Sequence, residues 1–88
     1  MDYVFTSHAH LEMRRRGLTE EIVHGVLEKP EQRWEVRRGR HVFQSRISMY
    51  RPEGTYLIRV FVDVDRQPPE VVTAYRTSKI EKYWRDDL

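Results

Sequence analysis

Apolar residues follow two different spacings along the chain, and the change between them lies near Pro30. Before it, the apolar residues between Ile22 and Leu27 recur every three or four positions, which is the spacing of one helix face. After Arg33, apolar and polar residues alternate, which is the spacing of a strand with one buried face. The pattern therefore predicts helices first and an antiparallel sheet after them.

Two short helices are predicted in the first third of the chain, after a β-prone run at residues 2–6. Ser7 is placed to cap a helix over residues 8–16, because a serine side chain readily accepts a hydrogen bond from the first helical turn. Thr19 is placed to cap a second helix in the same way, and Pro30 ends it. The first third is thus expected to form a strand and two helices.

The rest of the chain predicts further strands and a final helix. Residues 78–81 have the pattern of a capping box, which opens a short helix packed through Ile80, Tyr83 and Trp84. We therefore expect one α+β domain over residues 1–88, with an N-terminal strand, two helices, an antiparallel sheet of three to four strands and a short C-terminal helix. The sheet strands are expected at residues 33–37, 41–50, 56–64 and 70–76.

Two turns set the register of the predicted sheet. A turn at residues 51–54 places Phe43 opposite Val62, and a turn at residues 38–39 places Trp34 opposite Phe43. Both turns put apolar side chains on one face, which the helices are expected to cover. The predicted apolar face consists of Trp34, Val36, Phe43, Ile47, Ile58, Val60, Val62 and Val72.

The other face of the predicted sheet carries two arginines. The same register places Arg46 directly opposite Arg59, and like charges across adjacent strands are destabilising unless an anion or a carboxylate lies between them. Asp63, two residues from Arg59, is one candidate for that carboxylate, and a bound phosphate is the other. Tyr75 of the last strand is expected on the same face near Arg59.

The composition of the chain shows that its positive charge comes mainly from arginine rather than lysine. The 88 residues include 13 arginines but 3 lysines, no cysteine, and a net charge of +2. Without cysteine, disulfides and thiolate metal sites are excluded. The planar fork of arginine suits phosphate, which favours a nucleic-acid partner, although arginine-rich codon usage or heat adaptation gives the same composition.

Several classes of site are not expected. No apolar stretch approaches the ~20 residues that span a membrane, and no basic-then-apolar leader opens the chain, so we expect a cytoplasmic protein without membrane contact. His8 and His10, two positions apart on a helix, point to different sides and have no third ligand, so no metal or other cofactor is expected. His8 is instead a helix cap or an acid/base group.

Three motifs in order carry a resemblance that covers nearly the whole chain. They read F-T-S-H-A-H from Phe5, M-R-R-R-G-L-T-E-E-I-V from Met13 and E-V-V-T-A-Y-R-T-S from Glu70. In this order the chain resembles a bacterial family of domains of unknown function, DUF4258, which is similar to the RelE/ParE toxin superfamily with BrnT as a near relative. The resemblance implies that superfamily's RelE/ParE-like order of strand, two helices, antiparallel strands and terminal helix.

The resemblance also implies residue roles. RelE-type members use basic residues on the central strands and an acid/base group near the C-terminus. Arg46 and Arg59 match the first requirement as RNA phosphate-binding residues. Tyr83 or Tyr75 matches the second, and His8 matches the histidine of the family's S-x-H-A motif.

The function expected from the resemblance is that of a RelE-like toxin-type domain that acts on RNA, as a metal-independent endoribonuclease of a toxin–antitoxin pair. Many such members cut messenger RNA, often on the ribosome, and an antitoxin protein holds them inactive. A homodimer is a further expected assembly, since a chain of 88 residues has a small core. Two alternatives stay open: a non-catalytic RNA- or protein-binding module, and a ParE-like toxin that inhibits an enzyme such as gyrase.

Overall fold

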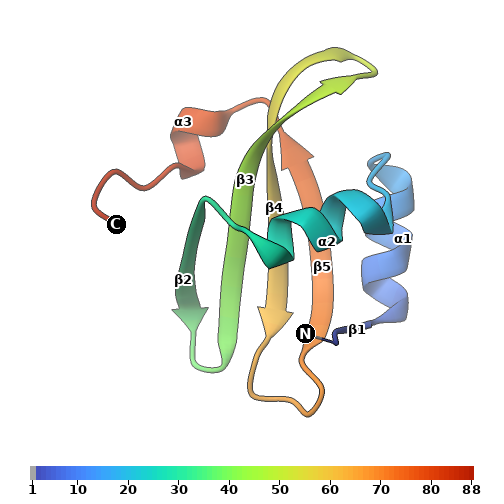
Figure 1. Cartoon of the computed structure of the whole chain (residues 1–88), viewed down its shortest axis with the longest axis vertical. Helices are drawn as coiled ribbons and strands as arrows, with labels where there is room; N and C mark the ends of the chain where they lie inside the picture. Colours follow the sequence, from blue (N-terminus) through green and yellow to red (C-terminus); the bar gives the residue numbers. More distant parts are fainter. Residues whose placement is uncertain (1) are drawn as a thin grey trace.

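The structure, a computed structural model that describes residues 2–88, has two helices near its N-terminal end that are each capped by a threonine (Figure 1). Thr6 accepts a hydrogen bond from the first turn of α1 (Ser7–Arg15) at 3.1 Å. Thr19 does the same for α2 (Glu20–Glu28), also at 3.1 Å. The predicted cap of the second helix is confirmed, but the first helix starts one residue earlier than predicted, because Thr6 rather than Ser7 caps it.

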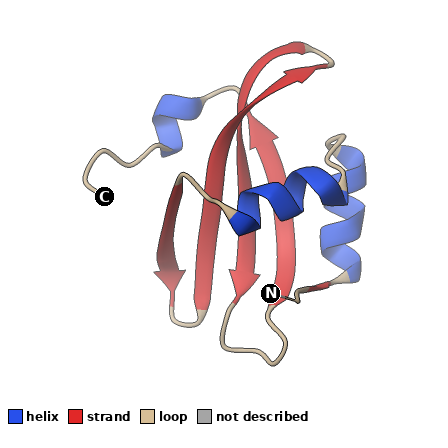
Figure 2. Cartoon of the chain, in the orientation of Figure 1, coloured by secondary structure: helices blue, strands red, loops and turns tan. Residues whose placement is uncertain are grey.

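The sheet has five strands in the order β1-β5-β4-β3-β2 (Figure 2). Neighbouring strands are antiparallel, except that β1 pairs with β5 in parallel. The α+β class is confirmed, but the expected antiparallel sheet of three to four strands is wrong, because the N-terminal strand joins the same sheet and makes it mixed. The strands are β1 (Val4–Phe5), β2 (Gln32–Arg37), β3 (Arg40–Tyr50), β4 (Glu53–Asp63) and β5 (Glu70–Thr77).

The hydrophobic core lies between one face of this sheet and the first two helices. α2 crosses β3 and β4, and α1 packs along β5 (Figure 1). Each fully buried aliphatic or aromatic side chain contributes about 1.5–3 kcal/mol, so this layer carries most of the stability. Its buried members are Ala9, Met13, Leu18, Val23, Val26, Leu27, Phe43, Ile58, Val60, Val62, Val71 and Ala74. No helix of residues 2–88 is long and apolar enough to cross a membrane.

The register of β3 against β4 differs from the prediction by two residues. Residues 51–52 alone form the turn, so Phe43 lies opposite Val60 rather than Val62. Because side chains alternate with a period of two, this shift changes the partners but leaves every side chain on its predicted face. The core positions predicted on these two strands are therefore confirmed, with Phe43, Ile58, Val60 and Val62 buried and Ile47 packed at the edge of the core.

A β-bulge in β2 reverses part of the prediction. The turn at residues 38–39 is as expected, but the pairing with β3 is irregular between Glu35 and Arg37. Trp34 therefore lies opposite Val42 and on the face away from the helices. Val36, at the bulge, is 41% exposed. Both residues were predicted in the core, and both predictions are wrong for this reason.

A second bulge affects β5. Phe61 pairs with Thr73 and Val62 with Val71, which leaves Val72 without a partner on β4. Val71 consequently takes the buried position that was predicted for Val72. After the bulge the alternation resumes, and Tyr75 lies opposite Arg59 on the face away from the helices.

The C-terminal segment returns to the sheet, as predicted, with Tyr83 against Tyr75 and Trp84 under Arg46, and hydrogen bonds add to these contacts. α3 (Ile80–Tyr83) is a single turn without a side-chain cap, so the predicted capping box does not form. The amide of Gln44 donates to the Tyr83 carbonyl at 3.2 Å, and the Gln32 side chain accepts from the Arg85 N–H at 3.1 Å. Two buried strand glutamines thus hold the terminal segment, whereas the predicted apolar side chains are only partly buried.

Deleting residues 79–88 should lower the melting temperature by about 5–10 °C, because it leaves Gln32 and Gln44 without these partners. Thermal unfolding followed by circular dichroism measures the change. Tyr50→Ala is the control, since Tyr50 is 83% exposed at the β3–β4 turn and should leave the melting temperature unchanged. An unchanged melting temperature in the deletion variant would show that the segment is a free tail.

Candidate functional site

Arg59, in the middle of β4, points away from the helices because its neighbours Ile58 and Val60 point into the core. The residue is only 7% exposed. Its Nε donates a hydrogen bond to Gln44 Oε1 at 2.8 Å, and its Nη1 donates to the Tyr75 hydroxyl at 2.8 Å. The guanidinium is therefore held by two neutral groups on the neighbouring strands.

Aromatic rings complete the surroundings of this cation. The guanidinium carbon of Arg59 lies 4.4 Å from the ring centre of Tyr83 and 5.3 Å from that of Phe61. Rings at these distances stabilise a cation through their negative faces. We call the cluster of Gln44, Arg59, Phe61, Tyr75 and Tyr83 the Arg59 site.

Within residues 2–88, no carboxylate forms an ion pair with Arg59. A guanidinium stays charged in a protein, and a nearly buried charge without a counter-ion is costly. The rings and the two hydrogen bonds offset part of that cost but add no negative charge. The Arg59 site is thus complementary to an anion.

The predicted opposition of Arg46 and Arg59 is wrong, because the shifted β3–β4 register places Arg46 opposite Leu57. The predicted carboxylate partner is also wrong, since Asp63 bonds to Arg40 at 2.7 Å. The Arg46 guanidinium instead pairs with Glu31 at 2.8 Å. Its charge is therefore already compensated, unlike that of Arg59.

Tyr75 and Tyr83 lie side by side, with ring centres 6.2 Å apart in an edge-to-face arrangement. Hydrogen bonding with Tyr75 is the main cause that holds the pKa of Tyr83 below its usual value of 10.0. Desolvation opposes this shift, while the charges of Lys82 and Arg59 add to it. Tyr83 therefore ionises more readily than an ordinary tyrosine, which suits it to accept a proton.

His8 is not brought to this cluster. His8 lies exposed in the first turn of α1. Arg16 lies just past the other end of that helix, and its guanidinium carbon is 5.6 Å from the ring centre of Tyr75. Eight residues of helix separate the two positions by ~12 Å along the axis. Of the three predicted acid/base candidates, the structure thus places Tyr75 and Tyr83 together and His8 elsewhere.

Two residues of the site were not anticipated from the sequence. Gln44 is completely buried and joins Arg59 to Gln32, whose side-chain oxygen accepts from Gln44 at 2.8 Å. For Gln44 a signal was present in the sequence, because an uncharged polar residue in the interior of a strand is rarely buried without a partner. Phe61 completes the cluster by stacking on Tyr75 with ring centres 6.1 Å apart.

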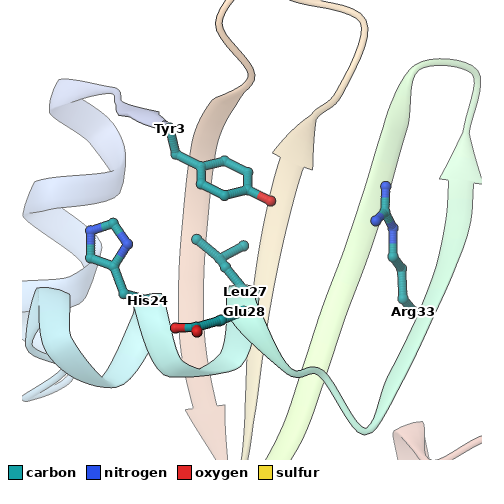
Figure 3. Close-up of a pocket in the computed structure, with 5 residues that line it drawn as sticks. All are labelled: Tyr3, His24, Leu27, Glu28 and Arg33. Carbon is teal, nitrogen blue, oxygen red and sulfur yellow. The ribbon is translucent and has the colours of Figure 1, made fainter. Parts of the chain in front are cut away.

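A separate hollow lies on the helix side of the sheet, between the N-terminus, the end of α2 and β2 (Figure 3). Its volume is about 480 Å³, and Tyr3 and Leu27 face each other in it. Arg33, on its far side, already donates to His41 at 3.1 Å and lies over the Phe43 ring. Within residues 2–88, no cluster of His, Asp or Glu suited to a metal ion occurs here or elsewhere. The residues that line this hollow therefore do not indicate a particular ligand or reaction.

Comparison with protein families gives one result. The model of a family described as a domain of unknown function (DUF4258) matches residues 5–76. That range includes Gln44, Arg59, Phe61 and Tyr75, and it stops before Tyr83. Searches of curated proteins and of solved structures found no significant match.

Replacing Tyr75 by Phe should raise the pKa of Tyr83 toward its ordinary value, because it removes the hydroxyl that most stabilises the ionised form. In the unaltered protein, one tyrosine should ionise at lower pH than the others, and Tyr83→Phe should abolish that early step. An absorbance titration of tyrosinate measures both effects. Tyr50→Phe, a change at an exposed tyrosine, is the control that should leave the early step in place. A single step for all tyrosines in the unaltered protein would contradict the assignment.

Proposed function

The chain belongs to the DUF4258 family of domains of unknown function, and we propose that it binds RNA at the Arg59 site and cleaves this RNA without a metal ion. The family assigns no activity, so the proposal rests on the geometry of the site. The observation that carries the proposal is the nearly buried Arg59 guanidinium, which has no carboxylate partner among residues 2–88. A phosphodiester supplies the missing negative charge.

The surroundings of Arg59 suit a nucleic-acid chain better than free phosphate. Phe61, Tyr83 and Trp34 present aromatic rings on the same face of the sheet, and bases of single-stranded RNA stack on such rings. Lys82 adds positive charge beside Tyr83, whereas Arg16, beside Tyr75, is paired with Glu12 at 3.1 Å. Stacking and phosphate contacts together define a path for a single strand.

The two tyrosines supply the proton transfers of RNA cleavage. The 2′-hydroxyl attacks the adjacent phosphorus in line, so its proton must be removed and the leaving 5′-oxygen must be protonated. Ionised Tyr83 accepts the first proton, and Tyr75 donates the second. The new bond joins the 2′-oxygen to phosphorus, the bond to the 5′-oxygen breaks, and the proton now on Tyr83 passes back to Tyr75, whose ring centre lies 6.2 Å from that of Tyr83.

Arg59 acts on the charge that develops during this step. Its hydrogen bond to Tyr75 places the cation next to the acid, and a fixed cation in a water-poor site stabilises the charged transition state. The products are a 2′,3′-cyclic phosphate and a 5′-hydroxyl. This is the reaction type expected of the RelE-like toxins that the sequence resembles, with tyrosines in the acid/base positions.

Arg59→Gln should weaken the binding of a single-stranded RNA and reduce the slope of log affinity against log salt by ~0.7, the loss of one phosphate contact. Fluorescence anisotropy at several salt concentrations measures the slope. Arg38→Gln is the matched control, because Arg38 is an exposed arginine in the β2–β3 turn. Arg59→Lys keeps the charge without the fork and should retain the slope. Equal slopes for Arg59→Gln and Arg38→Gln would contradict the proposal.

Tyr83→Phe should reduce RNA cleavage by about a hundredfold or more while RNA affinity stays within about twofold, because it removes a proton acceptor and leaves the cation in place. Cleavage is followed on labelled RNA in the presence of a chelator, and the product ends are tested for cyclic phosphate. Tyr50→Phe should cleave as well as the unaltered protein. If the unaltered protein binds RNA but never cleaves it, the domain is a non-catalytic binding module. If it binds no RNA, an enzyme-inhibiting toxin becomes the better account.

A further inference from the structure

A second hollow adjoins the Arg59 site, on the side of the terminal helix. It has a volume of about 590 Å³ and is lined by Arg46, Ile80, Glu81, Trp84 and Asp86. Tyr83 and Trp84 are consecutive, and each lies under an arginine: Tyr83 under Arg59 and Trp84 under Arg46. Trp84, which lines the hollow, thus directly follows Tyr83, which lies under the cation that we assign to phosphate.

The aromatic wall of this hollow is held in place. The guanidinium of Arg46 lies 4.2 Å from the ring centre of Trp84. Glu31 holds that guanidinium through two hydrogen bonds, at 3.1 and 2.8 Å, and also accepts from the Arg46 backbone N–H at 2.7 Å. The segment after Trp84 is tied to β2 through Arg85 and Gln32. A planar ligand that enters the hollow thus meets a fixed planar wall.

The two carboxylates that line the hollow, those of Glu81 and Asp86, are negatively charged, whereas the neighbouring Arg59 site is positively charged. Neither Glu81 nor Asp86 forms an ion pair with another residue in the range 2–88. Carboxylates accept hydrogen bonds and repel phosphate, so their place beside an RNA path calls for a ligand with N–H donors. Asp87, the next residue, differs because it pairs with Arg85 at 2.9 Å.

Among the RNA bases, guanine fits this hollow best. Its Watson–Crick edge carries two adjacent donors, N1–H and the N2 amino group, which match the two oxygens of one carboxylate. Adenine and cytosine each offer one amino group there, and uracil offers one ring N–H between two acceptors. The purine ring also provides the larger surface for stacking against Trp84 and Arg46.

We propose that this hollow binds a guanine base of the RNA whose neighbouring phosphate lies on Arg59, with Glu81 or Asp86 accepting from the base edge and the Arg46–Trp84 pair stacking on its ring. The inference rests on the proposed function and adds a base preference to it. The domain then selects single-stranded RNA that contains guanine next to the bound phosphate.

The test compares short oligo(A) RNAs in which one internal base is guanine, hypoxanthine or adenine, with binding measured by fluorescence anisotropy. The unaltered protein should bind the guanine RNA about tenfold more tightly than the adenine RNA. Hypoxanthine, which lacks the N2 amino group, should lie between them. Glu81→Gln and Asp86→Asn, singly and combined, should reduce the guanine preference. Asp87→Asn should keep it, because it removes a carboxylate from the same segment without touching the hollow.

The outcomes separate this inference from the proposed function. Equal affinity for the three RNAs in the unaltered protein would overturn the guanine preference and leave RNA binding intact. Variants at Glu81 and Asp86 that bind all three RNAs more tightly by the same factor would also overturn it, since the carboxylates would then only repel phosphate. Absence of binding to any RNA would contradict the proposed function and, with it, this inference.

Discussion

The buried charge of Arg59, which pairs with no carboxylate among residues 2–88, is the constraint on which the non-core face of the sheet depends. A guanidinium in this position needs hydrogen-bond acceptors and negative ring faces within a few ångströms. Gln44 and Tyr75 supply the acceptors from the two neighbouring strands, and Tyr83 and Phe61 supply rings. These neutral groups offset only part of the free-energy cost of burying the Arg59 charge. The site therefore favours a bound anion.

The same requirement links the terminal segment to the site. Gln44 bonds at once to Arg59, to Gln32 and to the Tyr83 carbonyl, so one buried amide joins three strands to the chain end. Satisfied networks of this kind are rigid, and the loss of one member leaves the others exposed or unpaired. Fixing Tyr83 and Trp84 in this way is what places one ring under Arg59 and the next under Arg46.

Much of the fold followed from the sequence, because the changes of period and the threonine cap of α2 are local signals. The position of Tyr75 near Arg59 followed too, since Ala74 faces the core as expected and strand alternation then puts Tyr75 on the other face. What could not be predicted were the bulges at Val36 and Val72, which moved Trp34 and Val71 and which no periodicity marks. The approach of Tyr83 to Arg59 depends on a buried amide far away in sequence, so it too required the structure.

The claim that Arg59 is an RNA phosphate site is tested most directly by the NMR signal of its side-chain Nε–H. Arg59 is nearly buried and its Nε–H donates to Gln44, so this signal should be protected from exchange and resolved from those of the exposed arginines. Titration with a single-stranded RNA should shift the Arg59 signal in proportion to occupancy, while the Arg38 signal stays in place. Shifts confined to exposed arginines such as Arg14 and Arg15, with the Arg59 signal unmoved at saturation, would contradict the account.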